Sequence, residues 1–213
     1  KDFNFINKKT KKKDEQFIEN NNKIDSYLEE NSKLIIILHQ RWMVKLSEKL
    51  FDNKEGYKEK SDLEWGSYIE PINLKKTSLK DRQKYIKEGL LSNINKIINQ
   101  DHKLILVYPV PEMGFHVPRV LNKNYLIDKS VPILSGSYDV YKIRNKLIFE
   151  ILDSVQSPNI YRVYPHKIFC DKQIKKRCVA NDENYIFYYD DNHLSIQGSK
   201  FVVDEIIKII ERF

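Results

Sequence analysis

The chain has 213 residues, of which 41% are hydrophobic and 31% are charged. This composition is that of one folded domain, and it excludes general disorder and a pair of full-sized domains. The longest aliphatic run covers residues 34–38, far short of the roughly 20 apolar residues that a membrane-spanning helix needs. The formal net charge is +7. Lysines are nevertheless spread along the chain, and the dense basic cluster is confined to residues 8–13, so we expect no nucleic-acid partner.

In chain order, we expect residues 1–13 to form a polar, basic N-terminal arm and residues 14–213 to form one α/β domain. Apolar residues at helical spacing predict a surface helix over residues 14–30. The all-aliphatic stretch 33–38 predicts a strand buried on both faces in a parallel sheet. Residues 47–77 show no periodicity, and we expect an irregular loop over the active face there.

The rest of the chain alternates between amphipathic helices and short apolar strands. This pattern predicts helices over residues 78–100, 137–155 and 195–212, and strands over residues 104–108, 160–164 and 185–189. Prolines after residue 108 end that strand and predict a loop through residue 136. The alternation indicates a mostly parallel sheet with helices on both faces, whose function gathers at the carboxyl ends of the strands.

Two cysteines, Cys170 and Cys178, lie eight positions apart. This spacing suits a local disulfide and not the Cys-x-x-Cys pattern of zinc or redox sites, although two buried free thiols are the alternative. A bridge would contribute roughly 2 to 3 kcal/mol in the chain-entropy model and would imply an oxidising compartment. Because no ligand-spaced cluster or glycine-rich phosphate loop is present, we predict no metal and no nucleotide cofactor.

The segment between the last expected strand and the last expected helix carries the chemistry. Asp190 and His193 are three positions apart in it. This spacing lets the carboxylate accept a hydrogen bond from the imidazole Nδ1–H and leaves Nε2 free to take a proton from a serine hydroxyl. An isolated histidine is more often a surface residue, but a carboxylate at this offset favours catalysis. Asp191 and Asn192 are interpreted as turn-forming residues, and Ser195 as the N-cap of the last helix.

The string Tyr-Tyr-Asp-Asp-Asn-His-Leu-Ser over residues 188–195, followed by Gly198, resembles the last conserved block of SGNH hydrolases. It is similar in particular to the SGNH domain fused to membrane acyltransferases of family 3. Two further pieces support the narrower likeness: a hydrophobic strand that ends in Arg41-Trp42, and a later strand that runs into a Pro-x-Pro-Glu segment ending at Glu112. A cysteine pair also precedes the Asp-x-x-His box in that group. The likeness covers roughly residues 23–213.

This resemblance implies a three-layer α/β/α, flavodoxin-like fold. It also implies that the domain transfers an acyl group to cell-surface carbohydrate or hydrolyses esters on it. The acyl group is expected to be acetyl. His193 would be the general base and acid, and Asp190 its orienting partner. The implied partners are a carbohydrate acceptor, an acyl donor and an upstream membrane acyltransferase domain in the same polypeptide. The implied location is extracytoplasmic, tethered to the membrane through an N-terminal region.

The departure from the family pattern concerns the nucleophile. The family serine lies in a Gly-Asp-Ser turn after the first strand, and this chain contains no Gly-Asp-Ser. We therefore expect the first strand and the serine to lie upstream of this chain, which by itself would be inactive. The alternative is a relative without a nucleophile that serves as a glycan-binding or interaction domain.

Other substrate-contacting residues are suggested by position. Gln40 and Arg41 stand at a strand end where a donor to an oxyanion or substrate oxygen is expected, although Arg41 could equally be a structural residue stacked on its neighbour Trp42. Trp65, Glu112 and His116 lie in expected loops over the same face and are candidates for substrate contact.

Overall fold

The computed structural model describes residues 5–7, 12–13, 15–47, 49–59, 69–71 and 78–213. Its helices are α1 (Glu15–Glu30), α2 (Met43–Leu46), α3 (Leu79–Asn99), α4 (Val117–Asp128), α5 (Tyr138–Asp153), α6 (Pro165–Phe169) and α7 (Ile196–Ile210). Its strands are β1 (Phe5–Asn7), β2 (Lys12–Lys13), β3 (Ile35–Leu38), β4 (Ile69–Pro71), β5 (Lys103–Val107), β6 (Ser135–Ser137), β7 (Ile160–Val163) and β8 (Arg177–Val179).

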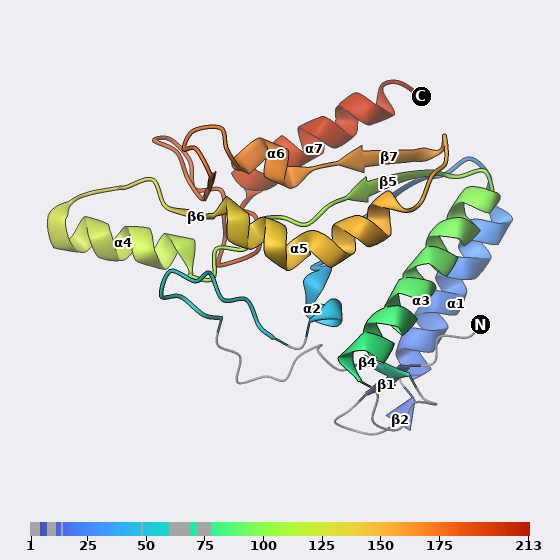
Figure 1. Ribbon diagram of the computed structural model, residues 1–213. Coiled ribbons are helices and arrows are strands. Elements are labelled where there is room, and N and C mark those ends of the chain that lie inside the picture. The colour runs from blue at the N-terminus through green and yellow to red at the C-terminus, as the bar shows by residue number, and fades with distance from the viewer. Residues whose placement is uncertain (1–4, 8–11, 14, 48, 60–68, 72–77) are drawn as a thin grey trace.

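A parallel sheet of order β3-β5-β7 forms the centre of the fold. Figure 1 shows α1, α3 and α5 on one side of this sheet and α7 on the other. The architecture is therefore the expected α/β arrangement, with a parallel sheet flanked by helices. In the described part, β1, β2 and β4 form a separate antiparallel sheet, so the segment expected as an arm contributes two short strands.

Two hydrophobic clusters cover the two faces of the sheet, because successive side chains of a strand point to opposite faces. Leu104 and Leu106 of β5 pack with α3 and α5. Ile105 and Val107 pack with α7 and with the segment that precedes it. These residues are almost completely buried. The continuous apolar run of β5 is thus explained by burial on both faces.

The prediction that the strand at 33–38 is buried on both faces is wrong for β3. This strand pairs with β5 along one edge, and no other described strand pairs with it. Ile36 and Leu38 pack into the cluster shared with α3 and α5, whereas Ile35 is 41% exposed and Ile37 is 50% exposed. Since Ile37 is in register with Ile105, the exposed isoleucines lie on the α7 face of the sheet.

Two other predicted elements are corrected. The expected loop through residue 136 contains α4, because Pro118 stands in the first turn of that helix, where its missing N–H costs nothing. The expected strand at 185–189 is not a strand, because the chain folds back on itself within a few residues. Tyr188 forms an isolated antiparallel bridge with Leu194, and Ile186 forms one with Asn181.

Several local predictions are confirmed. Ser78, Ser137 and Ser195 cap α3, α5 and α7, each accepting a hydrogen bond from a backbone N–H in the first turn. Cys170 and Cys178 form a disulfide, with 2.02 Å between the two Sγ atoms. None of the described helices combines the length and the apolar character that a bilayer crossing requires.

Candidate active site

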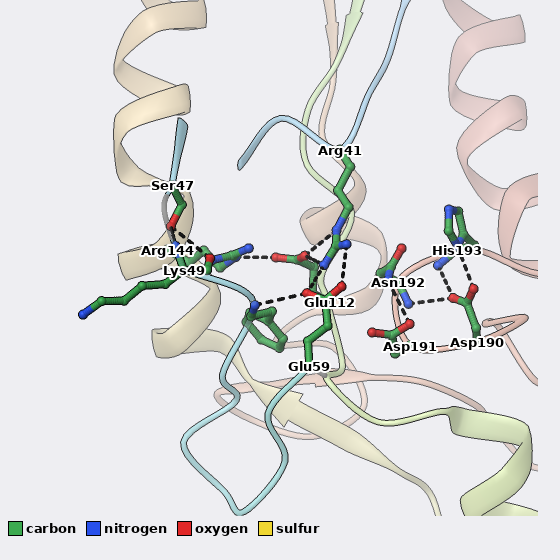
Figure 2. Close-up of polar contacts among 11 residues, drawn as sticks. Arg41, Ser47, Lys49, Glu59, Glu112, Arg144, Asp190, Asp191, Asn192 and His193 are labelled. Carbon is green, nitrogen blue, oxygen red and sulfur yellow. Dashed lines mark hydrogen bonds and ion pairs between the residues drawn. The ribbon is translucent and has the colours of Figure 1, made fainter. Parts of the chain in front are cut away.

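The central feature of the site is a hydrogen-bonded pair formed by Asp190 and His193. Asp190 Oδ2 lies 2.7 Å from His193 Nδ1, and Asp190 Oδ1 accepts the backbone N–H groups of His193 at 2.7 Å and Asn192 at 2.9 Å. Figure 2 shows the carboxylate beneath the imidazole ring. The imidazole side chain is 72% exposed, and no hydrogen bond to Nε2 is formed within the described part of the chain. The pair can therefore accept a proton at Nε2 while the carboxylate stabilises the resulting imidazolium.

Burial and hydrogen bonding act in opposite directions on the two adjacent carboxylates. Burial would raise the pKa of Asp190, but the N–H groups of Asn192 and His193 and the imidazole together lower it below its usual value. Burial raises the pKa of Asp191 above its usual value, and the negative charges of Asp190 and Glu59 add to that effect. Asp190 is thus held as the ionised partner of the imidazole, which is the state that an orienting carboxylate needs.

The lowered pKa of Asp190 predicts a pH-dependent contribution to stability. A carboxyl whose pKa is lower in the folded state stabilises the fold above its unfolded-state pKa of about 3.9, and this stabilisation is lost as the pH falls through the folded-state value. Wild type should therefore exceed Asp190→Asn in unfolding free energy at pH 7, and the difference should shrink below about pH 4. Urea unfolding between pH 2.5 and 7 measures it, with Glu211→Gln as the control. A difference that stays constant with pH would contradict the assignment.

Backbone contacts tie the turn that carries this pair to the carboxyl end of β5. The N–H of Met113 donates to Asp191 O at 2.8 Å, and the N–H of Val117 donates to Asp190 O at 3.0 Å. The buried hydroxyl of Tyr188 donates to Pro111 O at 2.8 Å. The loop after β5 and the turn before α7 therefore form one unit at the carboxyl edge of the sheet, where α/β domains build their sites.

Arg41, which follows the carboxyl end of β3, forms ion pairs with two carboxylates. Its Nε and Nη2 donate to Glu112 Oε1 at 2.8 and 2.5 Å, and its Nη1 and Nη2 donate to Glu59 at 2.8 and 2.7 Å. Burial disfavours the charge of the guanidinium, but the two carboxylates outweigh it and raise the pKa of Arg41 above its ordinary value. Four of the five N–H groups of its guanidinium donate to these carboxylates, which leaves one N–H group to donate to a substrate oxygen.

The remaining candidates are spread around the same edge. Gln40 is half-buried beside Arg41 and forms no side-chain hydrogen bond with the other described residues. His116 is exposed at the N-cap position of α4, without a side-chain cap bond. Trp65 lies outside the described residues. Ser195 donates its hydroxyl to Ile186 O at 2.6 Å and accepts the N–H of Gly198 at 3.1 Å, which leaves it as the helix cap.

Two residues of the site carried no signal in the sequence. Glu59 and Arg144 join Arg41 and Glu112 in one ion-pair network (Figure 2). Arg144 is 32 positions from Glu112, and Glu59 is 18 positions from Arg41. No motif spacing connects charged residues that far apart in the chain.

A parallel α/β sheet with a carboxylate–imidazole pair at its carboxyl edge defines a class of domain equipped for acid–base chemistry on a nucleophile. Residues 4–208 match the family model described as SGNH domain (fused to AT3 domains). Because this match spans almost the whole sequence, the chain belongs to that family.

The search of solved structures found a periplasmic domain of a lipopolysaccharide acetyltransferase from Salmonella ser. Paratyphi A. It shares 20% sequence identity with a TM-score of 0.46, over 60% of this chain and 49% of the other. The chain thus spans about half the length of that domain. No curated protein matches the sequence.

Proposed function

We propose that this chain supplies the acid–base half of an acyl-transfer site that acts on cell-surface carbohydrate. The observation that carries the proposal is the Asp190–His193 pair, with 2.7 Å between Oδ2 and Nδ1 and an accessible imidazole. Family membership supports it, since the family is described by its fusion to AT3 domains. The disulfide supports an extracytoplasmic location, because such bonds persist in oxidising compartments.

The proposed reaction proceeds through a serine acyl-enzyme. His193 Nε2 takes the proton of the serine hydroxyl as its oxygen attacks the carbonyl carbon of the acyl donor, and the proton then passes to the leaving group. In the second half, Nε2 takes a proton from a sugar hydroxyl or from water as its oxygen attacks the acyl-enzyme carbonyl carbon. The bond from that carbon to the serine oxygen then breaks, Nε2 returns the proton to the serine oxygen, and the ester or the acid is released. Gln40 is the freer of the two candidate donors to the oxyanion, because Arg41 is engaged by carboxylates.

The serine is proposed to come from an upstream segment that extends the sheet at β3. Within the described residues, β3 has one unpaired edge, and Ile35 and Ile37 are exposed on the α7 face. A parallel strand added there would end beside Gln40, at the same edge as His193. A helix of that segment on the α7 side would cover the exposed isoleucines, since helices cover both faces of a parallel sheet. An upstream membrane acyltransferase domain would then tether the site at the membrane.

A serine-directed fluorophosphonate tests this proposal. A longer polypeptide that includes the upstream segment should be labelled on a serine that precedes residue 1 of this sequence, and it should hydrolyse 4-nitrophenyl acetate. The 213-residue chain alone should show neither property. Peptide mass spectrometry locates the label. A labelled serine within the 213 residues, or a longer polypeptide that is folded yet inert to both reagents, would contradict the proposal, and polysaccharide binding by an inert protein would favour the glycan-binding alternative.

A further inference from the structure

Glu112 is the central carboxylate of the network next to the catalytic pair. Its side chain is only 8% exposed. Oε1 accepts hydrogen bonds from Nε and Nη2 of Arg41, and Oε2 accepts one from Nε of Arg144 at 2.5 Å. Figure 2 shows the carboxylate between the two guanidinium groups. Both of its oxygens are therefore engaged by protein, which leaves Glu112 poorly placed to bind a substrate.

The partners of Glu112 come from two different elements. Arg41 follows β3, and Arg144 lies on α5, so the carboxylate joins the carboxyl ends of two strands to a helix. Charge-assisted hydrogen bonds of this kind are stronger than neutral ones. Removing the carboxylate would leave two largely buried guanidinium groups facing each other with Glu59 as the remaining anion, which is a strongly unfavourable arrangement.

The backbone beside Glu112 holds the turn that carries the catalytic pair. Met113 follows Glu112 directly, and its N–H donates to Asp191 O at 2.8 Å. Four residues further on, the N–H of Val117 donates to Asp190 O at 3.0 Å. A displacement of Glu112 would thus be transmitted through one backbone hydrogen bond to Asp190, which binds the imidazole of His193, and through the other to its neighbour Asp191.

We propose that Glu112 is a positioning residue, which fixes the loop after β5 and through it the alignment of Asp190 with His193. This role replaces the expectation from sequence that Glu112 contacts the substrate. The proposed role of Glu112 rests on the proposed function in one respect, which is that the Asp190–His193 pair is taken to be catalytic. The geometry itself can be measured without any acyl transfer.

Glu112→Gln in the 213-residue chain tests the role. The variant keeps the shape of the side chain and removes its charge. Hydrogen exchange of the Met113 and Val117 amides, followed by NMR, should become roughly tenfold faster or more, because local opening controls their protection. The downfield resonance of the proton between His193 Nδ1 and Asp190 should broaden or disappear. The slowest amides of β5 should keep their relative protection.

Glu59→Gln is the matched control, because Glu59 also binds Arg41 but lies outside the loop after β5. It should change the exchange of the Met113 and Val117 amides and the resonance of the Nδ1 proton much less than Glu112→Gln does. Arg144→Gln is the second variant, should Glu112→Gln fail to fold, and it should have the same effect in smaller measure. Unchanged amides and Nδ1 proton in a folded variant, or a uniform loss of protection in every amide, would overturn the proposal. Neither outcome depends on whether the longer polypeptide transfers acyl groups.

Discussion

Replacing His193 with alanine is expected to lower ester hydrolysis and acyl transfer by roughly 10³- to 10⁴-fold in a polypeptide that includes the nucleophile. The reason lies in the pair itself: the imidazole is the group held by Asp190, and its Nε2 is accessible to a serine hydroxyl. Without it, the serine must lose its proton to water. The measurement is kcat/KM for an aryl acetate and for a sugar acceptor, together with a circular dichroism spectrum that shows the fold is retained.

The interdependence of the pair sharpens this prediction. Asp190→Asn should also cause a large loss, because an amide cannot hold the imidazole in the required tautomer and charge state. The double variant should be little worse than His193→Ala alone, since residues that act as one unit are not additive. Lys200→Ala, on the exposed surface of α7, is the control and should retain full activity. Full retention of activity in His193→Ala would remove the basis of the proposed function.

Gly198→Ala is expected to destabilise the domain by about 3 kcal/mol or more. A Cβ atom at Gly198 would lie 2.1 Å from Phe187 O and 2.9 Å from Phe187 C, which are backbone atoms that no side-chain rotation can move. The same carbonyl oxygen accepts the N–H of Ser195 at 2.9 Å, so the first turn of α7 and the segment before it would have to separate. Urea unfolding measures the loss.

The sign of this effect makes the test decisive. Alanine is a better helix former than glycine by about 1 kcal/mol, so an uncrowded glycine in α7 would give a more stable variant. Gln197→Ala, at the exposed neighbouring position, should change stability by no more than about 0.5 kcal/mol. Because Gly198 lies in the first turn of α7, shortly after the Asp190–His193 pair, its variant should also perturb the resonances of His193. A variant as stable as the wild type would contradict the close approach of α7 to Phe187.

The features that could be predicted from the sequence depend on contacts between residues that are close in the chain. The caps of α3, α5 and α7 each involve a serine and a backbone N–H three positions later. The Asp190–His193 pair has the same separation. The disulfide closes a separation of eight. Such contacts are restricted by a few backbone dihedrals, so residue type and spacing are enough to predict them.

The features that could not be predicted depend on what lies beside a segment in space. An aliphatic strand has the same sequence pattern at the centre and at the edge of a sheet, so the exposure of Ile35 and Ile37 in β3 followed only from the strand order. The aromatic segment 185–189 has strand-like composition, but its bridge partners lie within the same short fold-back. Burial and pairing are properties of the neighbours, and composition does not encode them.

The site shows the same division. The sequence by itself predicted the hydrogen-bonded pair of Asp190 and His193, because one turn holds both residues. Only the tertiary structure decided the contacts of Glu112, whose two carboxylate oxygens are bound by guanidinium groups, whereas the sequence indicated a substrate contact. Its partners Arg41 and Arg144 lie 71 and 32 positions away. The physical reason is that an ion pair requires charges within a few ångströms, and between residues so distant in the chain only the packing of β3, β5 and α5 creates that proximity.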